Sequence, residues 1–286
     1  MANPFFSINQ RFSLEMSPPA NMPIFILSSI WRSGSTALQR TLCTDKDILV
    51  WGEPYSDCNL FGSLSRSAMA LTQSHWPTLG HFPQDAIIYD QPEKFFIANL
   101  YPHISHMQKA HRTMLDTLFC YPAKEKGRER FGMKFVRLGK EECEYLEWIY
   151  PDAKFIVLIR NPWDAWKSYK GNNWMYRWPK GVVQTADQFA KLWLKQTEEL
   201  LAFTPTIENN ILKIRYEDYL KPNFDWDNLR AFCALLNISP EQSLEHKITG
   251  VQVAPNPVTE EDNQTIATIC GKLANPLGYL GPQNTI

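Results

Sequence analysis

The chain has 286 residues, of which 44% are hydrophobic and 21% are charged, and its formal net charge is −1. This composition is that of a globular protein with a sizeable core, and the charge argues against a general nucleic-acid-binding protein. No segment reaches the roughly 18 apolar residues of a membrane span, and no secretory signal is recognisable. The six cysteines show no metal-binding spacing. We therefore expect a cytoplasmic protein with reduced cysteines and no membrane partner.

The predicted elements begin after an irregular lead-in over residues 1–22, which contains three prolines. Residues 23–30 (PIFILSSI) are predicted to form a buried strand because they are short, apolar and partly β-branched, and residues 34–43 suit a short helix. Residues 54–130 hold five of the six histidines and no clear strand, with one helix expected at 103–119. We interpret this region as an insertion over the sheet edge that serves as a substrate lid.

The second half of the chain alternates strands with helices. Residues 153–160 (AKFIVLIR) are continuously apolar, as in strands that are covered on both faces of a parallel sheet. Thr185 and Gln188 form a capping-box pattern that opens a long helix to about Phe203. The alternation predicts an α/β fold with a central, mainly parallel sheet flanked by helices, in a single domain spanning residues 1–286. The other predicted elements are strands at 132–136 and 210–218 and helices at 140–151, 162–171, 225–236, 240–246 and 260–273.

The segment WRSGST, residues 31–36, has the composition of an anion-binding loop. It lies between the first predicted strand and helix, where ligands bind in open parallel sheets. The helix start presents free N–H groups and Gly34 allows close approach, while Arg32, Ser35 and Thr36 add donors. The alternative is a capped helix start with a surface arginine. The GxxxxGK[ST] pattern of magnesium–triphosphate sites is absent.

A second anion-binding position is predicted at the end of strand 153–160. Arg160 ends this strand, and Ser168 lies two turns into the following helix. The two side chains can converge on one phosphate, although each alone is also explained as a structural residue. Together with the loop at 31–36, they predict a ligand that carries two separated anionic groups.

Four segments, taken in order, resemble the sulfotransferases that use 3′-phosphoadenylyl sulfate (PAPS). SSIWRSGSTALQR is similar to their 5′-phosphosulfate loop, and FIVLIRNPWDAWKSYKG is similar to their 3′-phosphate motif. ILKIRYEDYL resembles their Tyr-Glu-Asp segment, and NPLGYLG resembles the Leu-Gly-Tyr ending of bacterial and carbohydrate-type members. The resemblance spans residues 23–281. It implies a P-loop-like three-layer fold, PAPS as donor, 3′,5′-ADP (PAP) as product, and no required metal.

The resemblance also implies roles for individual residues. Arg32 and the loop amides of Ser33, Gly34, Ser35 and Thr36 would hold the 5′-phosphosulfate. Arg160 and Ser168 would hold the 3′-phosphate, and Tyr216 would lie near the adenine. The chain departs from the cytosolic sulfotransferases at Arg32, where they carry lysine. It also lacks their glycine-rich Arg-Lys-Gly segment, so the residue that completes recognition of the 3′-phosphate is unassigned.

The general base differs from the cytosolic pattern as well. Their Lys-Thr-His strand motif corresponds to Lys134-Phe135-Val136 here, so valine occupies the histidine position. The segment WGEPYSD resembles the Gly-Glu-Pro segment of bacterial sulfotransferases, which implies Glu53 as the base. Lys134 would help to stabilise the transferring group. The alternatives are a purely structural Glu53, with His75 or His81 as the base.

The acceptor is predicted only as a class. A hydroxyl of a sugar or other small metabolite is the first expectation, in secondary metabolism, and a guanidinium nitrogen of a saxitoxin-type product is the second. Another alternative is a nucleotide-binding protein without catalysis. His103 and His106 are interpreted as solvated helix residues rather than metal ligands. Five aromatic residues are interpreted either as core or as a wall for the acceptor: Trp163, Trp166, Trp174, Tyr176 and Trp178.

Overall fold

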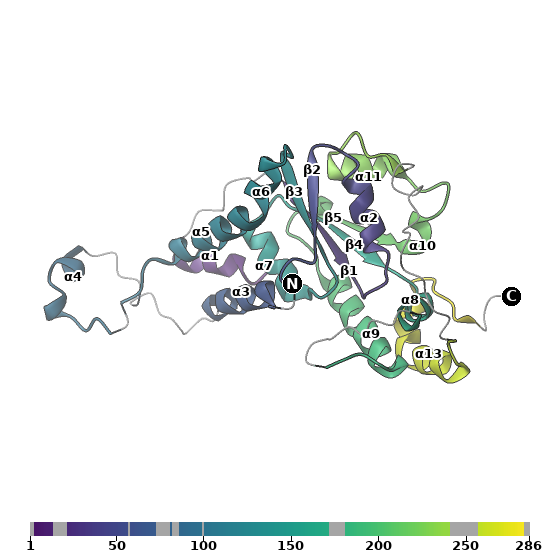
Figure 1. Cartoon of the computed structure of the whole chain (residues 1–286). Coiled ribbons are helices and arrows are strands. Elements are labelled where there is room, and N and C mark those ends of the chain that lie inside the picture. Colours follow the sequence, from purple (N-terminus) through teal and green to yellow (C-terminus); the bar gives the residue numbers. More distant parts are fainter. Residues whose placement is uncertain are drawn as a thin grey trace.

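A computed structural model describes residues 3–13, 22–56, 58–72, 81, 86–98, 100–171, 181–240 and 257–282 of the chain. Its centre is one sheet of five parallel strands in the order β2-β3-β1-β4-β5 (Figure 1). Helices cover both faces of this sheet, which confirms the predicted α/β fold. The strands are β1 (Ile24–Ser28), β2 (Ile48–Gly52), β3 (Arg130–Phe135), β4 (Lys154–Ile159) and β5 (Ile211–Arg215).

The parallel register brings the carboxyl ends of all five strands to one edge of the sheet. Ile26 of the central strand β1 lies opposite Lys134 of β3 and Ile156 of β4. Gly52, the last residue of β2, also lies opposite Lys134. The chain leaves β1 toward β2 on one side and leaves β4 toward β5 on the other. The β1–β4 crevice is therefore the topological switch point, where ligands bind in such sheets.

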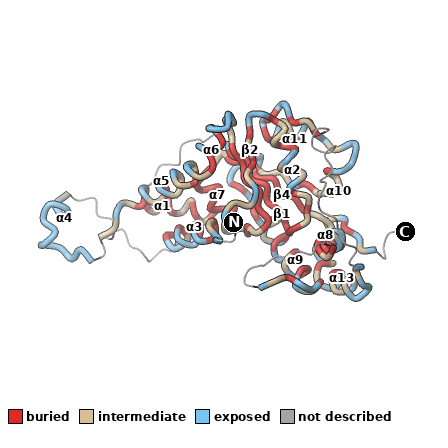
Figure 2. Tube along the Cα trace, viewed as in Figure 1, coloured by how far each residue is buried: buried red, intermediate tan, exposed pale blue. Residues whose placement is uncertain are grey.

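Alternate residues of β1 enter two separate hydrophobic clusters, one on each face. Ile24 and Ile26 pack with residues of α2 (Ser35–Leu42) and α11 (Trp226–Cys233). Phe25 and Leu27 belong to the larger cluster on the opposite face. The strands β1 and β4 are buried almost throughout (Figure 2), whereas the edge strands β2 and β5 are only partly buried. The larger cluster draws on α1 (Phe6–Phe12), α3 (Leu60–Met69), α5 (Ile104–Leu115), α7 (Lys140–Ile149), α8 (Pro162–Lys170), α9 (Ala186–Ala202) and α13 (Glu260–Ala274).

Most predicted strands and helices are confirmed, two local predictions are wrong, and some elements, such as β2, were not predicted. The lead-in is not wholly irregular, because it forms α1, which buries Ile8 and Phe12, and the preceding Phe5 is buried as well. The strand expected at 210–218 ends at Arg215, where the chain turns into the short helix α10 (Tyr216–Tyr219). The helix expected at 240–246 lies, apart from residue 240, outside the described residues.

The predicted insertion at 54–130 divides into a packed part and a projecting part. Helices α3 and α5 pack on α7, and α5 continues through a π-helical turn (Asp116–Cys120) into α6 (Tyr121–Glu125). Helix α4 (Ala86–Asp90) lies away from the sheet and is largely exposed (Figures 1 and 2). Its role as a lid stays a prediction. Within the described ranges, no helix is long and apolar enough to cross a bilayer.

Candidate active site

A cavity of about 380 Å³ opens at the edge where the strands end. Each strand contributes to it through the residues at or just beyond its carboxyl end. Its volume falls in the range of small-molecule sites. The structure thus brings the predicted site residues together, except the buried Ser33. The lining residues are Trp31, Arg32, Gly34, Ser35, Thr36, Ala37, Glu53, Lys134, Val136, Arg160, Ser168 and Tyr216.

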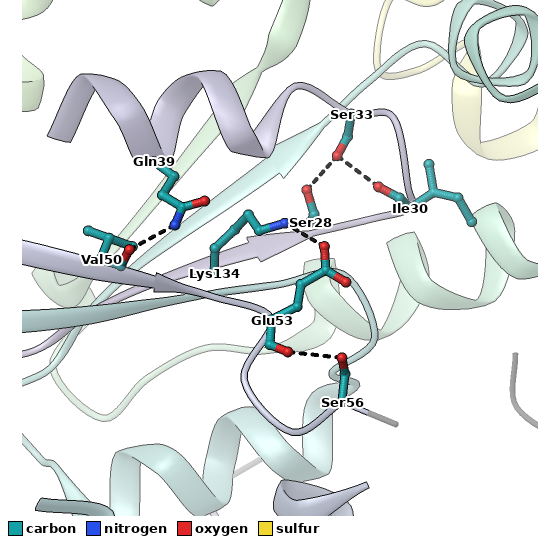
Figure 3. A network of polar contacts seen from close by, with 8 residues as sticks. All are labelled: Ser28, Ile30, Ser33, Gln39, Val50, Glu53, Ser56 and Lys134. Atoms are coloured by element: carbon teal, nitrogen blue, oxygen red, sulfur yellow. Dashed lines mark hydrogen bonds and ion pairs between the residues drawn. The ribbon is translucent and has the colours of Figure 1, made fainter. Parts of the chain in front are cut away.

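The loop after β1 is held in an unusual backbone conformation by buried hydroxyls. Arg32 and Gly34 have positive φ angles of 65° and 84°, which turn the chain sharply into α2. The hydroxyl groups of Ser28 and Ser33 lie 2.5 Å apart, and Ser33 donates to the carbonyl of Ile30 over 2.8 Å (Figure 3). The Ser33 side chain therefore stabilises the loop, and only its backbone amide is left for a ligand. The free N–H groups at the start of α2 favour an anion.

Tyr216 packs directly on Gly34, which explains the glycine in this loop. A Cβ atom at Gly34 would overlap the Tyr216 ring, whereas a Cβ atom at Gly127, which also has a positive φ, would meet nothing within 4 Å. We expect Gly34→Ala to cost about 1–3 kcal/mol of unfolding free energy from strain and displacement of the ring. Gly127→Ala is the matched control, with backbone strain alone. Urea unfolding of both variants measures the difference, and equal losses would contradict the packing constraint.

Arg160 joins the two predicted anion-binding positions. Its guanidinium donates from Nη1 to the carbonyl of Arg32 over 2.5 Å and lies 4.7 Å above the centre of the Tyr216 ring. Arg32 in turn donates from Nε to the Ser168 hydroxyl over 3.1 Å. The Nε atom of Arg160 is buried without a hydrogen-bond partner. Two guanidinium groups from β1 and β4 therefore line one cavity with donors to spare, as anion recognition requires.

A buried polar framework fixes the end of β4 from behind. The backbone amide of Asn161 donates to the Glu217 carboxylate over 2.9 Å, and the indole N–H of Trp193 donates to the carbonyl of Arg160 over 2.9 Å. Tyr279, from the NPLGYLG segment, donates to the carbonyl of Ile159 over 3.0 Å. Burial raises the pKa of Glu217 despite the neighbouring cations of Arg160 and Arg215. Glu217 was not singled out from the sequence, although it is the glutamate of the Tyr-Glu-Asp segment.

Glu53 and Lys134 form an ion pair at the opposite wall of the cavity. Lys134 Nζ lies 2.5 Å from Glu53 Oε1 (Figure 3). The Glu53 backbone amide donates to the Lys134 carbonyl over 2.9 Å. The Lys134 side chain is only 7% exposed, whereas that of Glu53 is 30% exposed. The carboxylate is thus held by a buried cation while part of it faces the cavity. Such a group can accept a proton from a ligand in the cavity.

Other predicted candidates lie elsewhere. His81 packs against Tyr101 with ring centres 5.3 Å apart and does not line the cavity. Trp163 and Trp166 are buried in the core. No group of three or more His, Cys, Asp or Glu within the described ranges is placed to hold a metal ion. His75, Trp174, Tyr176 and Trp178 lie outside the described residues, and His103 and His106 lie beside or on α5.

Trp31, Ala37 and Val136 also line the cavity. The sequence placed Trp31 in the loop 31–36 and Val136 at the position of the cytosolic histidine, without a role for either side chain. Ala37 was not indicated by any sequence signal. The cavity as a whole carries three cationic side chains, one carboxylate and a helix start. It can bind an extended anion and support proton transfer at one end.

Comparison with known proteins shows the family to which the chain belongs. The family model described as the sulfotransferase family matches residues 23–239. The solved sulfotransferase domain from the curacin biosynthetic pathway is 19% identical, with 94% of this chain and 100% of that chain covered and a TM-score of 0.51, which shows a shared fold. A sulfotransferase from Alicyclobacillus acidocaldarius is 16% identical, with 90% and 96% covered and a TM-score of 0.42. No curated protein matches the chain.

Proposed function

Because the chain belongs to the sulfotransferase family and is therefore an enzyme, we propose that it transfers the sulfuryl group of PAPS to a hydroxyl of a small-molecule or glycan acceptor. The product nucleotide is PAP. The observation that carries the proposal is the convergence of Arg32, Arg160 and the start of α2 on one cavity at the β1–β4 crevice. A donor with a phosphosulfate at one end and a 3′-phosphate at the other matches this pair of cations.

The residues that would bind the donor fit its chemistry. Arg32 and the amides at the start of α2 are assigned to the 5′-phosphosulfate, and Arg160 and Ser168 to the 3′-phosphate. One feature supports this assignment: the Nε atom of Arg160 has no protein partner. Tyr216 contacts both Gly34 and Arg160, which suits contact with the adenine end.

The mechanism follows from the two walls of the cavity. The acceptor oxygen attacks sulfur and forms a new S–O bond, while the bond from sulfur to the phosphate oxygen breaks. The electron pair of the broken bond leaves with PAP. Glu53 accepts the acceptor's proton. Arg32 and the N–H groups of α2 stabilise the charge that grows on the departing phosphate. Lys134 holds Glu53 and lines the same cavity, and we assign it a share in that stabilisation.

Ligand-induced thermal stabilisation tests the donor assignment directly. We expect PAP to raise the melting temperature, because a ligand that binds only the folded state stabilises it by mass action. ATP with magnesium is the comparison, since the magnesium–triphosphate loop pattern is absent. Stabilisation by ATP with magnesium and none by PAP would reject the proposed function.

Glu217 is expected to act on the donor through Arg160. Glu217→Gln keeps an oxygen that can accept the hydrogen bond from the backbone amide of Asn161, but it removes the negative charge beside Arg160. We therefore expect the Kd for PAP to rise about three- to tenfold with kcat little changed. Burial raises the pKa of Glu217, so its charged form opposes folding at neutral pH and the variant should not melt earlier.

Titration calorimetry with PAP and a thermal melt measure the two effects of Glu217→Gln. The exposed Glu208→Gln, which lies just before β5, is the matched control. A loss of stability with unchanged PAP affinity would show that Glu217 serves the fold alone.

A further inference from the structure

A second, much smaller pocket of about 20 Å³ adjoins the donor cavity at Glu53 and Val136, which line both. A molecule whose reacting oxygen lies at Glu53 can therefore rest its remaining atoms against the mouth of this pocket. The pocket is formed by the chain after β2, the start of α3 and the chain after β3. Its lining residues are Glu53, Pro54, Tyr55, Ser56, Asn59, Leu60, Phe61, Phe135, Val136, Arg137 and Leu138.

Apolar side chains make up most of the wall of this pocket. Phe61 and Phe135 pack edge to face with ring centres 4.9 Å apart, and they form a buried floor. Leu60 and Pro54 are partly exposed at its rim, beside the exposed ring of Tyr55. Apolar surface of this kind stabilises a ligand in proportion to the apolar area that the ligand buries.

Two polar side chains of the pocket, those of Ser56 and Glu53, are engaged within the protein. The Ser56 hydroxyl donates to the Glu53 carbonyl over 3.0 Å (Figure 3). The Glu53 carboxylate is paired with Lys134. The Arg137 guanidinium lies 5.7 Å from the centre of the Trp31 ring. A polyhydroxylated ligand would lose hydrogen bonds to water without regaining enough of them here, which costs binding free energy.

The charges of the pocket also disfavour a cationic ligand. Arg137 and Lys134 both lie beside the place where the acceptor would react, and like charges repel. Glu53, the acidic residue of the lining, already neutralises Lys134. A guanidinium group would therefore meet net positive charge, and a sugar would meet an apolar wall.

We propose that the acceptor is an alcohol on an apolar body, aliphatic or aromatic, that rests on Leu60 and Phe61 while its hydroxyl meets Glu53. This assignment rests on the proposed function. The acceptor oxygen forms the bond to sulfur, its proton passes to the Glu53 carboxylate, and PAP leaves with the electron pair of the broken S–O bond.

Transfer from radiolabelled PAPS to a set of four possible acceptors tests the proposed chemical class of the acceptor. The probes are n-octanol, benzyl alcohol, D-glucose and L-arginine, and the expected result is a higher kcat/KM for the two apolar alcohols. An equal or higher value for glucose or arginine would overturn the assignment. Transfer to none of the four, with stabilisation by PAP intact, would also overturn it but leave the sulfotransferase function standing. Absence of stabilisation by PAP would instead reject the proposed function itself.

Two matched variants on α3 test whether the acceptor binds at this pocket. Leu60→Gln places an amide in the pocket, whereas Leu64→Gln makes the same change one turn further along, at a partly buried residue that does not line the pocket. Leu60→Gln is expected to lower kcat/KM for the apolar alcohols about tenfold or more, with Leu64→Gln close to the unchanged enzyme. PAP should stabilise both variants equally. Equal losses in the two variants would place the acceptor elsewhere.

Discussion

Replacing Glu53 by glutamine is expected to lower kcat by about 10²–10⁴-fold, which is the range for loss of a positioned general base. The amide keeps the shape of the side chain but cannot accept the acceptor's proton. The Kd for PAP should stay within about twofold of its original value, because Glu53 lies on the wall opposite Arg160. Single-turnover transfer from PAPS and calorimetry with PAP measure the two quantities separately.

The exposed Glu261→Gln on α13 is the matched control for Glu53→Gln. It makes the same chemical change far from the cavity and should leave kcat unaltered. A fully active Glu53→Gln enzyme would show that the carboxylate only orients Lys134, and a histidine would then have to supply the base. Glu53→Asp should recover part of the activity, since it restores a carboxylate at a longer distance.

Replacing Arg160 by alanine should raise the Kd for PAP about 10- to 100-fold, because hydrogen bonds to a charged partner contribute roughly 1.5–3 kcal/mol. The loss has two causes. The 3′-phosphate loses its cation, and the carbonyl of Arg32 loses the donor that holds the anion loop in place. Calorimetry with PAP measures the change.

Arg160→Lys separates charge from geometry in the same measurement. Lysine keeps the positive charge but lacks the planar fork that reaches the Arg32 carbonyl and stacks on Tyr216. We expect an intermediate affinity. Unchanged affinity in Arg160→Ala would contradict the assignment of Arg160 to the donor.

The sequence predicts the parts of the fold whose local signals agree with their buried position. Strand β4 is continuously apolar and α9 opens with a capping box, and both form as predicted. Helix α3 was missed because its sequence, LFGSLSRSAM, contains Gly62 and three serines, which are weak helix formers. Packing on α7, which no local pattern reveals, stabilises it instead.

The candidate site is predicted as far as its residues occupy strand ends. Four of its residues lie at or just beyond the carboxyl end of a strand: Arg32, Glu53, Lys134 and Arg160. Because the carboxyl ends of parallel strands lie at one edge of the sheet, the strand assignments alone predict that these residues are close together. The contacts between them could not be predicted in the same way. The packing of Tyr216 on Gly34 depends on the position of α10, which the sequence suggested only as the end of a strand.

Because β2 is an edge strand, the two halves of the active site have unequal freedom to diverge. The donor is held by residues that follow the interior strands β1 and β4, whereas the base and about half of the wall beside it lie in the chain after β2, at residues 53–56 and 59–61. The rest of that wall comes from the end of the interior strand β3 and the chain after it. Surface connections accept replacement and changes in length far more readily than central strands do. An ancestral enzyme of this architecture could acquire new sulfate acceptors by remodelling that one segment while it inherited the nucleotide machinery intact, and an engineer can follow the same route.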